Sequence, residues 1–252
     1  MKAIYNIMCA ALLVCGLSSC EKDNYDAPDA GIEGVIYDST TGQPLQTASG
    51  KTSMQIRIYE TTWAENDSSI TVSPQDLNMK QDGTFSNYKL FPGVYTVQPF
   101  QGAFYPLSSK EIKKVALNSG EVTKVEFTVT PYLTLEWVKE PYLDGDTIKC
   151  AVKFTRNVGN GPMPDIRNMQ MYISHNQYVP GTDPQITPVA LSQGTGSGKI
   201  NNDMEGQTIE LKSLPIKYSN RYWVRIGAKC NDTYQKENYT DIRTIDVTVP
   251  SK

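Results

Sequence analysis

Apolar and polar residues alternate along several short segments of the chain, and this two-residue period is typical of half-buried β-strands. The alternation is clear in residues 54–59, residues 148–154 and residues 222–228. Segments rich in Gly, Pro, Asn and Asp separate these runs, as turns separate the strands of a sheet. Sustained helical periodicity is almost absent. The pattern therefore predicts an all-β protein.

The first half of the chain carries an ordered series of turn sequences between short strands. These are D-x-x-T-G-x-P-L from Asp38, D-G-x-F from Asp82 and P-G-x-Y from Pro92. The order resembles that of the prealbumin-like, or carboxypeptidase-regulatory-like, domain over residues 31–130. The pattern predicts strands at residues 31–38, 54–59, 93–97, 113–117 and 122–129, and another after the Asp82-Gly83 turn. The resemblance implies a β-sandwich whose turn-makers are structural rather than catalytic: Asp38, Gly42, Gly83 and Gly93.

The second half begins at Pro131-Tyr132 and carries a different signal. A Leu-Pro corner at residues 211–215 precedes the alternating strand at residues 222–228. This resembles the E–F region of fibronectin type III and related Ig-like domains, which implies a second two-sheet sandwich over residues 131–252. Strand parity places Trp223 and Arg225 on the outward face, whereas Trp137 shares a face with Leu residues and is expected in the core.

Cys150 and Cys230 both fall on inward strand faces of this second domain. An Ig-like disulfide between them is one alternative in an oxidising compartment. Cys150 lies in the middle of its strand and Cys230 near the end of its own. The two residues are therefore expected at different levels along the sandwich, whereas a disulfide requires their Cα atoms to lie within about 7 Å of each other. Two buried free thiols are therefore the expectation.

The N-terminus predicts export and lipidation. Lys2 precedes an apolar run that is too short to cross a bilayer and has the length of a signal-peptide core. The run ends in Leu-Ser-Ser-Cys at Cys20. This resembles a bacterial lipobox, which implies removal of residues 1–19 and acylation of Cys20; the plainer alternative is an ordinary secretory signal with an incidental cysteine.

Residues 20–30 are expected to form a lipidated tether. Their acidic and polar sequence resembles the export signal of Bacteroidetes-type lipoproteins, which implies an outer-membrane protein that faces the cell exterior. A solvated tether without a sorting role is the alternative, and the two are compatible.

Composition narrows the classes of function. The chain has 252 residues and a net charge of −3, without a basic run, so nucleic acid is not an expected partner. The single histidine, His175, and the absence of metal-site cysteine spacing argue against a metal site or other cofactor. No nucleophile–base pair or carboxylate pair stands out, so the protein is not expected to be an enzyme.

The lipobox, the acidic tether and the two sandwich types together resemble a family of Bacteroidetes-type surface lipoproteins of unassigned biochemistry. Such proteins are associated with SusC/SusD-type glycan-uptake systems. The resemblance implies an accessory carbohydrate-binding role, with an oligosaccharide as ligand and an outer-membrane SusC/SusD-type protein as partner.

Aromatic side chains that stack on sugar rings are the candidate ligand-binding residues. Trp63 lies in a long polar stretch from Glu60 to Gln81 and either faces solvent or folds over a sheet edge. Trp223 points outward, with packing against the first domain or a partner protein as the alternative. Tyr234 and Tyr239 lie in the expected connection between the last two strands.

The alternative class of function is structural. Fimbria-associated and adhesive lipoproteins of the same bacteria bind protein partners and contain prealbumin-like domains. Their maturation needs a cut after an arginine near the N-terminus, whereas the first arginine here is Arg57, inside a predicted strand. The glycan-binding interpretation is therefore preferred.

Overall fold

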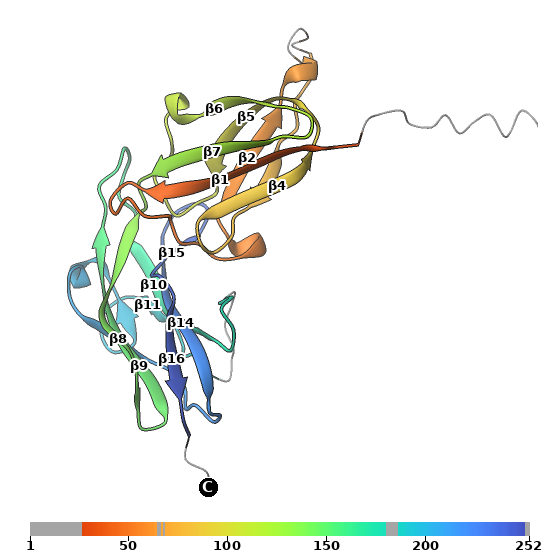
Figure 1. The fold of residues 1–252 in the computed structure, drawn as a ribbon. Coiled ribbons are helices and arrows are strands. Elements are labelled where there is room, and N and C mark those ends of the chain that lie inside the picture. The colour runs from red at the N-terminus through yellow and green to blue at the C-terminus, as the bar shows by residue number, and fades with distance from the viewer. Residues whose placement is uncertain (1–26, 65–66, 68, 180–185, 250–252) are drawn as a thin grey trace, which may run out of the picture.

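The structure is a computed structural model that describes residues 27–64, 67, 69–179 and 186–249. It is all-β, with two β-sandwiches joined end to end (Figure 1). The strands are β1 (Ala30–Asp38), β2 (Gln55–Glu60), β3 (Gln75–Asn78), β4 (Thr84–Leu90), β5 (Gly93–Phe100), β6 (Lys113–Leu117), β7 (Val122–Val129), β8 (Leu133–Asp144), β9 (Thr147–Arg156), β10 (Ile166–Ser174), β11 (Leu191–Gln193), β12 (Lys199–Ile200), β13 (Ile209–Lys212), β14 (Asn220–Cys230), β15 (Glu237–Tyr239) and β16 (Arg243–Val247). The predicted fold class is confirmed.

The first sandwich packs a three-stranded sheet, β4-β1-β7, on a four-stranded sheet, β3-β2-β5-β6. β1 pairs antiparallel with β4 and parallel with β7. Alternate residues of each sheet point inward, as the sequence pattern requires. Ile32 and Phe85 from one sheet and Ile56 and Val97 from the other are buried in one core.

Turn chemistry explains the ends of these strands. The Asp38 carboxylate accepts hydrogen bonds from the backbone N–H and hydroxyl of Thr40, both at 2.7 Å, and Gly42 follows with φ of 70°. In the same way, Asp82 Oδ1 accepts hydrogen bonds from the backbone N–H and the hydroxyl of Thr84. Gly83, between these two residues, has a φ of 82° and leads the chain into β4. These residues shape turns as predicted.

Gly93 differs from that expectation, because it is the first residue of β5 and does not have a positive φ. A Cβ atom at this position would lie 2.9 Å from Thr62 Oγ1 and 3.0 Å from Glu60 Oε1. Glycine is therefore needed here for close approach rather than for a left-handed turn.

The second sandwich packs β13-β9-β8 on a larger sheet in which β14 is central. β14 pairs with β10 on one side and with β15 and β16 on the other. Trp137 is only half-buried; it packs against this core and donates its indole N–H to Asp241 Oδ1 at 2.9 Å. Tyr132, between the two sandwiches, packs against both cores.

Two strands lie where the sequence indicated loops. β3 lies within the polar stretch that begins at Glu60, and β15 lies within the expected connection before the last strand. β3 is an edge strand, paired only with β2 in its sheet. Its residues are mostly exposed, so they show no apolar alternation that could reveal it.

Cys150 and Cys230 are both buried and unbonded, which confirms the expectation of free thiols. They lie on opposite sheets of the second sandwich, on β9 and β14. Burial raises the pKa of each thiol to about 12, so the reactive thiolate is scarce at neutral pH.

We expect neither thiol of the folded protein, produced as residues 21–252, to react with iodoacetamide at pH 8. Both should react after denaturation in guanidinium chloride, because unfolding restores an ordinary thiol pKa. Mass spectrometry of the alkylated protein checks this. Rapid modification of the native protein, or a mass two protons lower under non-reducing conditions, would contradict the buried-thiol assignment.

Candidate functional site

A groove of about 790 Å³ runs between the two sandwiches. One wall comes from the segment before β2 and from the end of β3 with the turn that follows it. The other wall comes from the segment after β10, from β14 and from the start of β16. The lining residues are Ser49, Gly50, Asn78, Met79, Lys80, Gln81, Asp82, Gln177, Tyr178, Trp223, Ile242 and Thr244.

Two aromatic side chains line this groove. Trp223 lies on β14, between Ser174 of β10 and Thr244 of β16, and is half-buried. Tyr178 lies just beyond β10 and is 60% exposed. The outward orientation predicted for Trp223 is therefore correct, and the first sandwich lies across the groove from it.

Polar groups surround the aromatic rings. Asp82 uses Oδ1 for the turn, where it accepts from Thr84. Asn78 Oδ1 accepts a hydrogen bond from Gln55 Nε2 at 3.1 Å. Lys80 is exposed and adds a flexible ammonium group on the same wall. The groove thus combines flat apolar surfaces with amide, carboxylate and ammonium groups.

The wall that carries Tyr178 is held by one amide side chain. Gln81 Nε2 donates to the carbonyl of Gln177 at 2.7 Å, and Gln81 Oε1 accepts from the backbone N–H of Val179 at 3.2 Å. Both bonds cross from the first sandwich to the second. They fix the backbone on either side of Tyr178.

Arg225 makes the second set of contacts at the junction, and its burial differs from the prediction. It lies on the outward face of β14, as expected, but is 1% exposed because the first sandwich covers it. Its Nη1 donates to the Thr47 carbonyl at 2.8 Å, and its Nη2 donates to the Val179 carbonyl at 2.6 Å. The guanidinium carbon lies 3.9 Å from the centre of the Tyr239 ring. Arg225 therefore joins the two sandwiches rather than facing solvent.

A buried carboxylate lies beside this arginine. Glu237 is 7% exposed and accepts hydrogen bonds from the hydroxyls of Tyr172 and Tyr239. Burial lowers the pKa of Arg225, and the nearby Tyr239 and Glu237 oppose that shift. Burial, together with Glu237, raises the pKa of both tyrosines. These tyrosines therefore remain hydrogen-bond donors to the carboxylate across the physiological range.

The structure does not bring Tyr239 or Tyr234 into the groove. Tyr239 is on β15 rather than in a loop, and its ring and hydroxyl are engaged by Arg225 and Glu237. It lies at the domain junction and lines a different cavity, of about 310 Å³, so its predicted ligand-binding role stays a prediction. Tyr234 is in the loop and 41% exposed, and its ring meets the Phe100 ring edge-on at 5.5 Å.

The backbone of Trp63 lies in a short 3-10 turn, Thr62–Ala64, but its side chain is outside the described part of the structure. Cys20 and residues 1–19 also lie outside the described residues. In the part of the chain that is described, no helix is long and apolar enough to span a membrane. Within the same part, no three His, Cys, Asp or Glu side chains gather as metal ligands.

Sequence reasoning missed most of the groove. Tyr178 is one of 15 tyrosines in the chain, and Asp82 and Gln81 belong to an ordinary turn in the sequence. Their joint position depends on how the two sandwiches meet, which the alternation of single strands does not encode. The one indication in the sequence was the alternation of residues 222–228, which places Trp223 on the outward face of its strand.

Comparison with known proteins finds a family match over the first sandwich. Residues 30–130 match the family described as "Protein of unknown function (DUF3823) N-terminal domain". This agrees with the expected family of unassigned biochemistry. A search of curated proteins found no match.

Solved structures share the fold of both sandwiches. A DUF3823 family protein from Bacteroides uniformis ATCC 8492 has a TM-score of 0.74 at 23% identity, covering 88% of this chain and 100% of its own. One from Parabacteroides merdae ATCC 43184 has a TM-score of 0.63 at 21% identity, covering 88% and 100%. A further protein of B. uniformis ATCC 8492, described as "a putative carbohydrate binding protein", has a TM-score of 0.63 at 20% identity, covering 87% and 100%.

We expect Arg225→Met to loosen the junction between the sandwiches. The substitution leaves the buried carbonyls of Thr47 and Val179 without their donors, and each orphaned acceptor costs about 1–3 kcal/mol. The free energy of unfolding should fall by about 2–5 kcal/mol, measured by calorimetry, and limited proteolysis should cut faster near residue 130.

Arg221→Met is the matched control, because Arg221 is on the same strand but 57% exposed in its pair with Asp246. It should lose less than about 1 kcal/mol. Equal losses in the two variants would show that Arg225 does not hold the junction.

Proposed function

Because residues 30–130 match the N-terminal domain of a family of unknown function, we propose a function from the groove itself. The protein is a carbohydrate-binding protein, and the groove between its sandwiches holds an oligosaccharide. The observation that carries the proposal is the pairing of Trp223 and Tyr178 with polar side chains in one groove.

This combination suits the chemistry of a sugar. Pyranose rings present patches of C–H groups that pack on aromatic faces, and their hydroxyls both donate and accept hydrogen bonds. Trp223 and Tyr178 offer the faces, while Asn78, Lys80 and Asp82 offer acceptors and donors. A cleft of this size with convergent polar groups is also the usual form of a ligand site.

The description of one protein of similar structure supports the same proposal. That protein, 20% identical to this chain, is described as carbohydrate-binding on a provisional basis. The description concerns that protein, and the present proposal rests on the groove. We assign binding and no catalysis to the site.

The proposal places the protein at the outer surface of the outer membrane, attached through acylated Cys20. Nine residues separate Cys20 from β1, and a flexible coil of nine residues would span about 17 Å. β4 runs from Thr84, beside the groove, to Leu90, which pairs with Ala30 at the start of β1. The groove therefore lies at the end of the first sandwich away from the tether, where an external glycan can reach it.

In this proposal the protein serves a SusC/SusD-type glycan-uptake system as an accessory component. Its tether holds it at the membrane that such a system occupies. The groove then retains glycan close to the point of uptake, which raises the local concentration of ligand.

We expect Trp223→Ala to weaken glycan binding at least about tenfold, because it removes a stacking surface. The measurement is a glycan-array screen of residues 21–252, followed by calorimetric titration with the best ligand. Trp223→Phe should keep part of the affinity. Tyr218→Ala, which removes a 67% exposed ring outside the groove, is the control and should bind normally.

An array without any bound glycan would overturn the proposal and favour the rival role in which the protein binds a protein partner. Full binding by a folded Trp223→Ala protein would show that the groove is not the site.

We expect Cys20→Ala to release the protein from the membrane, because the acyl chains that hold it are lost. Cell fractionation should move the protein from the outer-membrane pellet to the soluble fraction, and labelled fatty acid should no longer be incorporated. Continued sedimentation of the variant with the outer membrane would refute the lipid-anchor proposal.

A further inference from the structure

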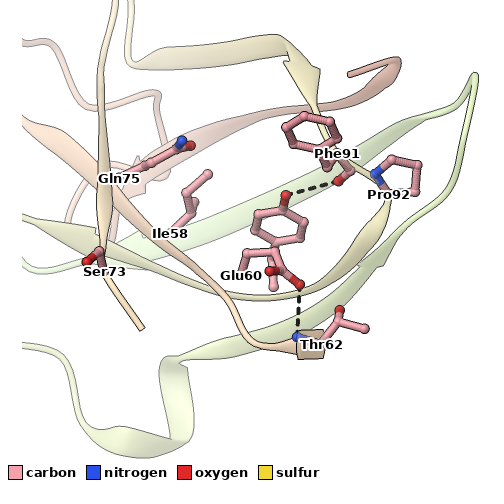
Figure 2. A pocket seen from close by; sticks show the side chains of 8 residues that line it. Ile58, Glu60, Thr62, Ser73, Gln75, Phe91 and Pro92 are labelled. Atoms are coloured by element: carbon pink, nitrogen blue, oxygen red, sulfur yellow. Dashed lines mark hydrogen bonds between the residues drawn. The ribbon is translucent and has the colours of Figure 1, made fainter. Parts of the chain in front are cut away.

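A second cavity, of about 590 Å³, lies in the first sandwich at the end of β4 away from the groove. Figure 2 shows the side chains that line it. It is formed where β2 ends, β3 begins and the turn between β4 and β5 passes over the sheet. It shares no lining residue with the groove.

The floor and one wall of this pocket are apolar. Ile58 and Tyr95 form the floor, with 1% and 4% exposure. The Tyr95 hydroxyl donates to the carbonyl of Phe91 at 2.9 Å and so fixes the turn above it. Phe91 itself is 52% exposed and forms the wall together with Pro92. An aromatic ring is thus held open to solvent by a rigid turn.

Polar groups form the remaining sides. Glu60 Oε1 accepts the backbone N–H of Thr62 at 2.9 Å, which fixes the carboxylate at the rim. The hydroxyl of Thr62 accepts from the Val94 N–H at 2.6 Å and keeps its own proton to donate. Ser73 and Gln75 lie on the opposite side of the cavity in Figure 2.

Gly93 keeps this rim in place. A side chain there would press on Thr62 and Glu60 at 2.9 and 3.0 Å, where their polar atoms border the cavity. The rim is therefore a close-packed arrangement around a hollow rather than a loose loop.

The charge of the lining selects the class of ligand. Among the described residues that line the pocket, one is acidic and none is a lysine or arginine. An anionic ligand would meet the Glu60 carboxylate without a compensating cation, which is unfavourable. A purely apolar ligand would bury the carboxylate, the amide and the hydroxyls without partners. A neutral ring with an apolar face and several hydroxyls fits both the apolar floor and the polar sides of the pocket.

We propose that this pocket is a second binding site, which takes one neutral sugar residue stacked on Phe91, with its hydroxyls on Glu60 and Gln75. The site is independent of the groove in its residues and deepens the proposed function by giving the chain two glycan contacts. β4 has seven residues and separates them by about 20 Å. One long glycan that reaches both sites would gain avidity from their linkage.

The test is an NMR titration of ¹⁵N-labelled protein, residues 21–252, in which the amide chemical shifts are measured. The ligands are the neutral methyl glycosides of glucose, galactose, mannose and xylose. Glucuronate is the anionic contrast. At least one neutral sugar should shift the amides of Glu60, Thr62, Gln75 and Tyr95, and glucuronate should not.

Phe91→Ala should weaken this binding about tenfold, since it removes the ring but keeps the carbonyl that Tyr95 binds. Glu60→Gln should weaken it less, because the amide keeps one acceptor oxygen. Tyr88→Ala, which removes a 51% exposed ring of β4 outside the pocket, is the control and should leave the titration unchanged.

The two proposals fail separately. Trp223→Ala should leave the shifts at Glu60 and Tyr95 intact even if it abolishes binding in the groove. The pocket proposal is overturned if none of the neutral sugars shifts these amides. It is equally overturned if glucuronate binds as well as they do, or if Phe91→Ala binds normally.

Discussion

A buried cation lies at the junction of the two sandwiches, where it adds to the hydrogen bonds that Gln81, Tyr105 and Asn238 make between them. Arg225 bridges the carbonyls of Thr47 and Val179 and lies against Tyr239. Desolvating a guanidinium is costly unless its donors are satisfied. Thr47 is the acceptor that the first sandwich supplies, so separation of the sandwiches would leave Nη1 without a partner, in addition to the buried Nε, which has none. The same contact holds Val179, whose N–H binds Gln81, and so fixes the wall that carries Tyr178.

The rigid junction gives the proposed glycan site its form. A binding groove between two freely moving sandwiches would lose part of its affinity to the ordering of both. Here Gln81 and Arg225 order the groove before any ligand arrives. The second pocket needs no such junction, because Tyr95 and Gly93 hold it within a single sandwich. The two sites therefore differ in what a loosened junction would do to them.

Much of the fold could be read from the sequence because the strands are half-buried. β7 spans the predicted residues 122–129, and the turns at Asp38 and Asp82 form through the side chains that predicted them. β3 and β15 were not predicted as strands, because their residues do not alternate between apolar and polar. The burial of Arg225 escaped for a different reason: strand parity gives the face of a sheet and says nothing of what covers that face.

The sequence by itself determined the all-β class, the faces of the strands and the turns at Asp38 and Asp82, whereas it left a disulfide between Cys150 and Cys230 open. These properties follow from the two-residue period and from local side-chain chemistry, which act over a few residues. Only the tertiary structure decided that Trp223 and Tyr178 share a groove, that Tyr239 is occupied and that Phe91 overhangs a pocket. Each of these depends on segments distant in the sequence, whose meeting is set by packing between sheets and between sandwiches.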